Sequence, residues 1–328
     1  MEKELVRRLG IPFKGIPAAG VHGVGLVRLP GNIIRLLNGV SRSHQILQEF
    51  HPDCILFTGG YVAAPMAIAA RRCPSLLFVP DIEPGLALKF LARKARVIAL
   101  SANDSKVFFP HRVNLKVTGY PVREDLQDWT RNKAAKTLHL KSSDPVLLIL
   151  GGSKGARSIN RAVMSVLEEL LERWQIVHVT GQLDWKEIQS QAKKISPKLQ
   201  NHYHVFPYLH EEMGAALASA DLVVSRAGAS TLGEYPFFGL PAVLVPYPYA
   251  WRYQKVNTDY LVKHKAAIMI RDEELGTRLL PVISELAADP KRMVSMQKAM
   301  KKMAKPRAAN DIADLLSNLA GTSRGSRA

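Results

Sequence analysis

Short apolar runs recur along the chain, and most end directly in glycine, proline or small polar residues. This is the pattern of strands buried on both faces of a parallel sheet. The expected strands are 54–57, 75–79, 97–100, 146–150, 176–179, 222–224 and 242–245. Helical patterns lie between most of them, at 33–50, 86–94, 156–173, 211–220 and 230–238. Because strands and helices alternate, the sequence predicts an α/β fold with helices on both faces of parallel sheets.

A polar stretch divides this pattern in two. Residues 123–144 contain no apolar run, and a new strand–loop–helix unit begins at Val146. The 328 residues are enough for two domains of roughly 150 residues each. We therefore predict a first domain over residues 1–125 and a second over residues 126–328, which ends in a terminal helix. Methionines at 293, 296, 300 and 303 should pack one face of a late helix on the body of the protein, with a basic helix that lies on a membrane as the alternative.

The chain is strongly basic, with 45 Lys and Arg against 28 Asp and Glu and a formal net charge of +17. Nucleic acid, an anionic membrane and a diphosphate substrate all suit such a surface. The excess is spread along the chain, and neither an RNA-binding aromatic signature nor zinc-finger spacing is present. We therefore expect an anionic membrane surface as a partner, and no nucleic acid.

The cysteines, the lengths of the apolar runs and the first residues together predict a cytoplasmic protein. The two cysteines, Cys54 and Cys73, form no CxxC pair, so we expect neither a metal site nor a disulfide framework. No apolar run is long enough to span a bilayer, and the first residues lack the features of a signal peptide.

A glycine-rich turn follows the strand at 146–150. Gly151, Gly152 and Gly155 lie between that strand and a helix, where backbone N–H groups can approach a phosphate. The turn is not a Walker A loop, because GxxxxGK[ST] is not satisfied. An ordinary tight turn between strand and helix is the alternative interpretation.

A second loop of this kind follows the strand at 222–224 and reads SRAGASTLGE over residues 225–234. Ser230 and Thr231 offer hydroxyl and N–H groups at a helix start, which suits a diphosphate. Glu234 lies one turn further on, where a carboxylate can accept from two ribose hydroxyls. Helix capping is the alternative, although Ser230 and Glu234 miss the capping-box spacing by one residue.

Aromatic and amide side chains follow the strand at 242–245. Tyr247 and Tyr249 come first, and Gln254 and Asn257 share a helix face because they are three residues apart. Side chains just past strand ends line the crevice where open α/β sheets bind ligands. Ordinary surface amides are the alternative.

In their order and spacing, these motifs resemble the MurG-type glycosyltransferases of family 28. The first half adds TGGYVAAP at 58–65 and TGYPVR at 118–123, which are similar to two loops of that family. The resemblance implies the GT-B fold, in which two Rossmann-like domains face a cleft. It also implies inverting, metal-independent transfer of N-acetylglucosamine from UDP-GlcNAc to a lipid-linked acceptor, undecaprenyl-diphosphate-muramyl-pentapeptide, in peptidoglycan synthesis. No cofactor is implied beyond the UDP-sugar donor, and the enzyme should be peripheral on the inner face of the cell membrane.

The resemblance also assigns roles to positions. Ser153 should bind the diphosphate, Arg123 should pair with phosphate or sugar, and the backbone near His210 should meet the uracil. The full set of expected donor-binding residues is Arg123, Ser153, His210, Ala229, Ser230, Thr231, Glu234, Gln254 and Asn257. On the acceptor side the expected residues are Gly59, Gly60 and Tyr61.

The sequence departs from the family at its beginning. The family starts with a strand and a GGTGGH loop that supplies a candidate base histidine, whereas Met1–Val6 already resembles a helix beyond that loop. We therefore expect the first domain to lack its first strand, either by truncation or because a separate polypeptide supplies it. The catalytic base is unassigned. Asp81, which stands where the family has Asn, is a candidate, with loop capping as the alternative.

Three further interpretations stay open. Residues 26–50 combine apolar side chains with interleaved arginines, which favours either membrane contact or a helix facing its own core. The acceptor could be another lipid or a small molecule. The chain could also be a non-catalytic UDP-sugar-binding subunit.

Overall fold

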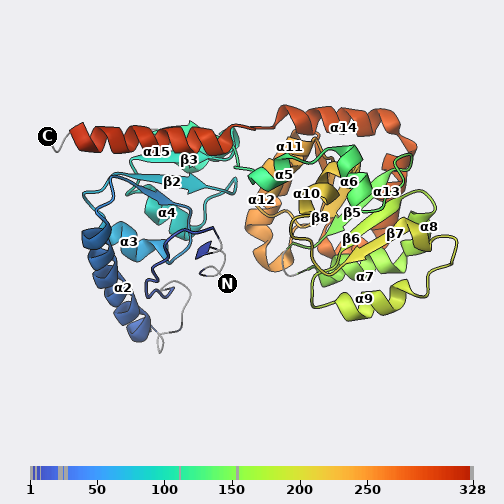
Figure 1. The fold of residues 1–328 in the computed structure, drawn as a ribbon, viewed down its shortest axis with the longest axis horizontal. Helices are drawn as coiled ribbons and strands as arrows, with labels where there is room; N and C mark the ends of the chain where they lie inside the picture. Colours follow the sequence, from blue (N-terminus) through green and yellow to red (C-terminus); the bar gives the residue numbers. More distant parts are fainter. Residues whose placement is uncertain are drawn as a thin grey trace.

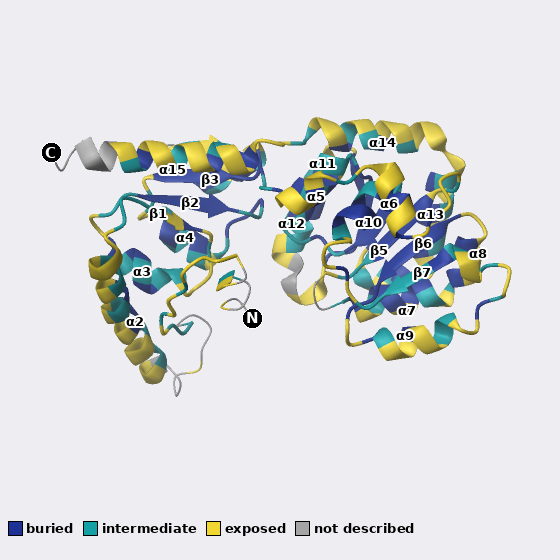
Figure 2. Ribbon diagram, in the orientation of Figure 1, coloured by how far each residue is buried: buried dark blue, intermediate teal, exposed yellow. Residues whose placement is uncertain are grey.

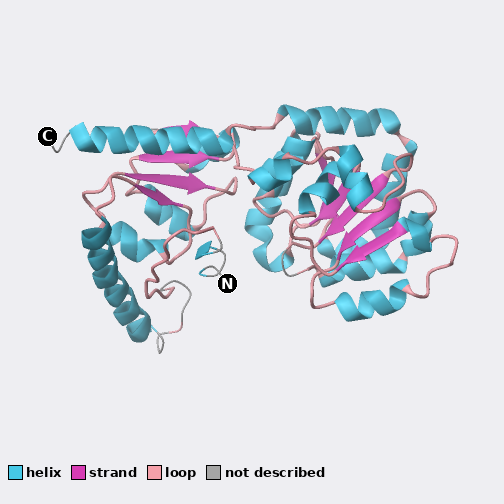
Figure 3. Cartoon of the chain, viewed as in Figure 1, coloured by secondary structure: helices cyan, strands magenta, loops and turns pink. Residues whose placement is uncertain are grey.

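The computed structural model describes residues 3, 6–7, 9–20, 25, 29–110, 112–152 and 155–325. Two lobes lie side by side, each built on one parallel sheet that is covered by helices (Figure 1, Figure 3). None of the described helices is both long enough and apolar enough to cross a lipid bilayer.

The first lobe contains a four-stranded sheet in the order β1-β2-β3-β4. Every pair of neighbouring strands is parallel. Its strands are β1 Ile55–Phe57, β2 Ser75–Val79, β3 Val97–Leu100 and β4 Leu115–Val117. Its helical elements are α2 Leu29–Phe50, α3 Ala63–Ala69, α4 Leu86–Ala92 and η1 Asn103–Phe108.

The second lobe contains a six-stranded parallel sheet in the order β10-β9-β8-β5-β6-β7. The chain starts in the middle at β5, moves outward to β7, and returns to the other side of β5 at β8. The strand order therefore reverses between β5 and β8, and open α/β sheets bind ligands at such a point. The strands are β5 Val146–Leu150, β6 Gln175–Val179, β7 Tyr203–Phe206, β8 Leu222–Ser225, β9 Ala242–Leu244 and β10 Ala267–Met269.

Helices cover both faces of this second sheet. They are α5 Glu124–Gln127, α6 Arg131–Thr137, α7 Arg157–Ser165, α8 Leu167–Leu171, α9 Trp185–Ala192, α10 Met213–Ser219, α11 Thr231–Phe238, α12 Trp251–Lys263, α13 Leu275–Ala288 and α14 Pro290–Lys302. Short 3₁₀ turns are η2 Gln200–His202, η3 Pro248–Ala250 and η4 Asp272–Glu274. On β5, Leu147 and Ile149 belong to one hydrophobic cluster, whereas Val146 and Leu148 belong to the other. This alternation buries both faces of the strand, as a central parallel strand requires.

The C-terminal helix α15, Ala308–Gly325, returns to the first lobe (Figure 1). Its Ile312 and Leu319 pack in one buried cluster with Leu76 and Phe78 of β2. Figure 2 shows this buried face of the helix along the sheet. The predicted domain boundary at residue 125 assigns α15 to the second domain. The buried side chains of α15, however, belong to the core of the first lobe.

Charged side chains of α12 also reach across to the first lobe. Arg252 Nε lies 2.9 Å from Glu83 Oε1, and Lys263 Nζ lies 2.8 Å from Asp104 Oδ2. The hydrogen bond from Arg252 lowers the pKa of the Glu83 carboxyl, although burial acts in the opposite direction. These contacts fix one arrangement of the two lobes.

The strands expected from apolar runs all form, within one or two residues of the predicted ends. Strands β4, β7 and β10 were not predicted, because they lie at the edges of their sheets and have short apolar runs. The single helix expected over 156–173 is wrong, because a turn at Val166, whose φ and ψ of −131° and +24° are not helical, separates α7 from α8. The packing predicted for the methionines is confirmed, since Met296 and Met300 are buried.

Candidate functional site

A cavity of about 820 Å³ lies at the carboxyl ends of β5, β8 and β9, where the strand order reverses. Its lining residues come from the second lobe: Leu150, Gly151, Gly152, Gly155, Ala156, Arg157, Ser158, Leu183, Asp184, Arg226, Gly228, Ser230, Thr231, Glu234, Tyr235, Tyr247, Pro248, Tyr249, Gln254 and Asp272. The structure thus brings the loop after β5 and the loop after β8 to one cavity.

The loop after β5 requires its glycines for steric reasons. Gly152 and Gly155 have φ of +84° and +78°, a region that other residues rarely adopt. A Cβ atom on Gly155 would lie 2.4 Å from the carbonyl oxygen of Thr180, and one on Gly151 would lie 2.1 Å from the nitrogen of Ala156. The loop is therefore a tight turn that directs backbone towards the cavity and starts α7 at its edge. The predicted phosphate ligand Ser153 lies outside the described residues.

The loop after β8 presents backbone donors at the start of α11. Both the hydroxyl and the N–H of Thr231 donate to the carbonyl of Gly228, at 2.7 and 3.1 Å. The N–H groups of Gly228, Ala229 and Ser230 have no acceptor within the described part of the chain. A Cβ placed on Gly228 would meet no atom within 4 Å, so this backbone faces open space. Successive free N–H groups at a helix start favour an anion.

Glu234 provides a carboxylate to the cavity, beside Asp184 and Asp272, which are paired with Arg157 and Arg226. It is half-buried one turn into α11, and burial raises its pKa, while the Ser230 hydrogen bond and the charge of Arg123 act to lower it. A carboxylate whose surroundings disfavour its charge is suited to accept hydrogen bonds from ligand hydroxyls.

Gln254 reaches the cavity from α12 with its orientation fixed. Its Oε1 accepts from the N–H of Tyr247 at 2.8 Å and from the N–H of Ala227 at 3.3 Å. Because both bonds use the oxygen, the side-chain nitrogen is left as the donor available to a ligand.

Arg226 organises the floor of the cavity, a role that the sequence analysis did not assign. Its side chain is only 10% exposed, and its guanidinium donates to Asp272 Oδ1 at 2.6 Å and to Ser158 Oγ at 2.8 Å. The same group lies 5.2 Å from the ring centre of Tyr247, which forms a ring pair with Tyr249 at 5.4 Å. Arginine directly after a buried strand is the only sequence signal for this cluster, because Asp272 is 46 residues away.

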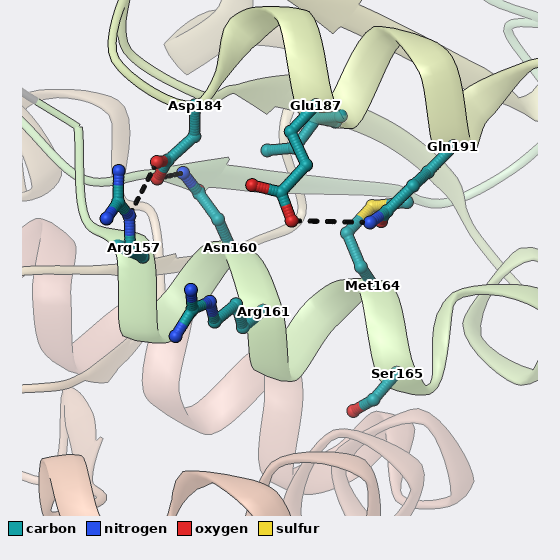
Figure 4. Close-up of a pocket in the computed structure, with 9 residues that line it drawn as sticks. Arg157, Asn160, Arg161, Met164, Ser165, Asp184, Glu187 and Gln191 are labelled. Atoms are coloured by element: carbon teal, nitrogen blue, oxygen red, sulfur yellow. Dashed lines mark hydrogen bonds and ion pairs between the residues drawn. The ribbon is translucent and has the colours of Figure 1, made fainter.

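Hydrogen bonds to the buried side chain of Asp184 hold another wall. Arg157 donates to Asp184 Oδ1 at 2.8 Å, and Asn160 donates to Asp184 Oδ2 at 2.9 Å (Figure 4). Asn160 also pairs with His178 Nε2 at 3.0 Å, and burial lowers the pKa of His178 to about 3. A smaller cavity of about 260 Å³ lies beside this network, between α7 and α9. No set of three His, Cys, Asp or Glu in the described ranges could hold a metal ion.

Several predicted donor residues do not line the cavity. His210 is exposed and forms a ring contact with Tyr208 at 4.5 Å. Arg123 is also exposed, with its nearest carboxylate at Asp125, 3.5 Å away. Asn257 is fully buried, and its amide bonds to the first lobe and to Ala227. Ala229 lies between the lining residues Gly228 and Ser230.

The candidate base and the acceptor-side residues belong to the first lobe. Asp81 is half-buried just after β2, and burial raises its pKa, while a hydrogen bond from Asn257 acts to lower it. Gly59, Gly60 and Tyr61 follow β1, and both glycines have positive φ, +112° and +78°. Tyr61 is exposed. These residues lie at carboxyl strand ends in the first lobe, outside the lining of the cavity.

Comparison with known proteins gives the family. Residues 1–100 match the glycosyltransferase family 28 N-terminal domain, and residues 146–314 match the family 28 C-terminal domain. A relative from Roseiflexus sp. (strain RS-1) is 38% identical, covering 97% of this chain and 81% of the relative. One from Desulforudis audaxviator is 36% identical, covering 98% of this chain and 88% of the relative. Both are named UDP-N-acetylglucosamine–N-acetylmuramyl-(pentapeptide) pyrophosphoryl-undecaprenol N-acetylglucosamine transferase.

Solved structures support the same family and fold. Acinetobacter baumannii MurG superposes with a TM-score of 0.76 at 27% identity, covering 97% of this chain and 88% of that one. The UDP-GlcNAc 2-epimerase of Neisseria meningitidis, at 14% identity and a TM-score of 0.65, shares the fold. The predicted GT-B class, with two Rossmann-like lobes, is therefore confirmed. With both of its lobes matched and relatives this similar along nearly its whole length, the chain belongs to glycosyltransferase family 28.

Proposed function

We propose that the protein transfers N-acetylglucosamine from UDP-GlcNAc to a lipid-linked acceptor, undecaprenyl-diphosphate-muramyl-pentapeptide. The activity for which its relatives are named supports this reaction. The observation that carries the proposal is the single cavity in which two glycine loops, Glu234 and Gln254 meet. It offers backbone donors, a carboxylate and an amide donor together, and a nucleotide diphosphate sugar presents complementary groups.

The chemistry of these groups supports one orientation of the donor. The diphosphate lies beside the glycine loop after β5 and the free N–H groups of 228–230, because a helix starts after each loop and helix N-termini favour an anion. The ribose hydroxyls donate to Glu234. The sugar lies near Gln254, whose nitrogen donates to a hydroxyl or to the acetamido oxygen.

Departure of UDP leaves negative charge on the diphosphate, and a cation stabilises it. Arg123 is the proposed cation, because it is close enough to influence the pKa of Glu234 and is held by one carboxylate at 3.5 Å. The acceptor approaches from the first lobe, past Gly59, Gly60 and Tyr61.

The acceptor carries a lipid, and α2 supplies a surface that fits one. Ile33, Ile34 and Leu37 are 44%, 58% and 62% exposed on this helix, and Arg35 beside them is also exposed. Apolar side chains among cations bind an anionic bilayer through burial and charge together. We propose that α2 lies on the inner face of the cell membrane.

The test combines binding with turnover. Calorimetry with UDP-GlcNAc comes first, followed by transfer of radiolabelled sugar to undecaprenyl-diphosphate-muramyl-pentapeptide or to diacylglycerol. Binding together with transfer to undecaprenyl-diphosphate-muramyl-pentapeptide supports the proposal. Transfer only to diacylglycerol would mean that the acceptor is diacylglycerol instead. Binding without transfer to either favours a non-catalytic UDP-sugar-binding subunit. Absence of heat with UDP-GlcNAc would reject the donor site itself.

A further inference from the structure

Asn257 occupies a position that a donor-binding side chain would not occupy. It lies on α12 with no exposed surface, and its amide makes three hydrogen bonds. Its Oδ1 accepts from the N–H of Ile82 at 3.0 Å, and its Nδ2 donates to Asp81 Oδ1 at 2.8 Å and to the carbonyl of Ala227 at 3.2 Å. Both side-chain N–H groups are therefore used by the protein.

These partners belong to different lobes. Asp81 and Ile82 follow β2 in the first lobe, whereas Ala227 follows β8 in the second. Other cross-lobe ion pairs come from the same helix, but their cations are exposed: Arg252 is 71% and Lys263 is 70% exposed. Asn257 is thus a link between the two carboxyl strand ends whose own side chain is shielded from water.

The peptide at Ala227 is held on both sides by α12. Gln254 accepts from its N–H, and Asn257 donates to its carbonyl. The next three residues, 228–230, present the free N–H groups at the cavity. The direction in which those groups point therefore depends on a side chain that is also bonded to the first lobe.

We propose that Asn257 is a positioning residue that couples docking of the first lobe at Asp81 to the geometry of the donor loop at 227–230. This inference rests on the proposed function, because it takes the cavity as the donor site. It gives Asp81 the role of an anchor for the lobe contact instead of that of a base.

Exchanging the side chains of residues 81 and 257 distinguishes the bond from Asn257 to Asp81 from the bond from Asn257 to Ala227. In Asn257→Asp, a carboxylate oxygen faces both the Asp81 carboxylate and the Ala227 carbonyl, so both bonds are lost. In Asp81→Asn, the amide oxygen of the new residue still accepts from Asn257. In the double variant, residue 81 donates to residue 257, which restores the link between the lobes and leaves the Ala227 carbonyl unpaired.

Kinetics give the first readout, with active enzyme counted by UDP-GlcNAc titration. Asn257→Asp should lower kcat/KM by at least about 30-fold, the size expected when charge-assisted hydrogen bonds become repulsive. Asp81→Asn should lower it by less than about tenfold. The double variant should recover at least about tenfold over Asn257→Asp, a coupling typical of contacting pairs. Thr258→Val is the matched control, because Thr258 is buried on the same helix and its hydroxyl donates to the carbonyl of Gln254 on that helix.

Hydrogen–deuterium exchange without nucleotide gives the second readout. Asn257→Asp should speed exchange in peptides covering 80–86 and 226–234, and the double variant should restore protection only in 80–86. Equal exchange in all variants would overturn the proposal, as would a double variant no better than Asn257→Asp or loss of turnover in Asp81→Asn. If the wild type fails to bind UDP-GlcNAc, the proposed function fails, and the exchange comparison still decides whether Asn257 links the two loops.

Discussion

The side-chain oxygen of Gln254 accepts from the N–H of Tyr247 at 2.8 Å, and this bond directs the side-chain nitrogen away from the backbone. In Gln254→Glu, one oxygen keeps the bonds to Tyr247 and Ala227, whereas the donor nitrogen becomes a charged acceptor. The fold should be retained. The new charge repels the diphosphate of UDP and that of UDP-GlcNAc alike. Only UDP-GlcNAc also loses a hydrogen bond, the one from Gln254 to its sugar.

Calorimetry with two ligands separates these effects. The affinity for UDP-GlcNAc should fall by about 1.5 to 3 kcal/mol more than the affinity for UDP, since a hydrogen bond is replaced by an unpaired charge. This corresponds to roughly 10- to 150-fold. Equal losses for the two ligands would place Gln254 away from the sugar.

Two glycines of the cavity should respond in opposite ways to alanine. Gly228→Ala meets no atom within 4 Å, so the thermal midpoint should stay close to that of the wild type while the added methyl obstructs the ligand. Gly155→Ala puts a methyl 2.4 Å from a carbonyl oxygen at a φ of +78°, so it should destabilise the lobe by about 2 kcal/mol or more. Thermal unfolding and UDP-GlcNAc titration of both variants test this contrast, which fails if Gly228→Ala binds as tightly as the wild type.

The central strands could be predicted from the sequence, because strands buried on both faces must be apolar throughout. Val146–Leu150 is such a strand. Edge strands escape this rule, since Tyr203–Phe206 includes a histidine and is only partly buried. The break at Val166 was also unpredictable, because the helical pattern continues through it.

The glycine loop after β5 could likewise be predicted, since positive φ and close backbone contacts demand glycine at fixed offsets from a strand. The partners of Asn257 could not. Spacing places Asn257 on the same helix face as Gln254, but Asp81 is 176 residues away in the other lobe. Local patterns carry no information on how two lobes dock, and the same reason hides the pairing of Arg226 with Asp272.

Removing the charge of Glu234 should weaken nucleotide binding. Glu234→Gln keeps the shape of the side chain, but a neutral amide accepts hydrogen bonds from the two ribose hydroxyls more weakly than a carboxylate does. The affinity for UDP-GlcNAc should therefore fall by about 2 to 4 kcal/mol, or roughly 30- to 1000-fold. In the wild type, burial raises the pKa of Glu234, so its charge is lost at a higher pH than for an ordinary glutamate as the pH falls. Affinity should decline on acidification in the wild type and change less in Glu234→Gln. Parallel pH profiles would contradict this assignment.

Binding to anionic vesicles should depend on the exposed apolar side chains of α2. Ile34→Glu with Leu37→Glu removes two side chains that could enter the bilayer, each contributing about 1 kcal/mol or more, and adds two repelling charges. Flotation with phosphatidylglycerol vesicles should fall by at least about tenfold. The matched control is Val107→Glu with Val294→Glu, which makes the same charge change at exposed positions on η1 and α14. Equal flotation of the two double variants would show that α2 does not form the membrane contact.

His178 should make the second lobe sensitive to acid. Burial lowers its pKa to about 3, so the folded protein leaves the ring neutral while an unfolded chain takes up a proton near its ordinary pKa of about 6.5. Stability from this group is therefore present at neutral pH and is lost as the pH falls below about 6.5, by about 2 kcal/mol at pH 5. His178→Gln lacks this titration, so its thermal midpoint should fall about 4–8 °C less between pH 7 and pH 5 than that of the wild type. An unchanged slope in His178→Gln would mean that other groups set the acid limit of the fold.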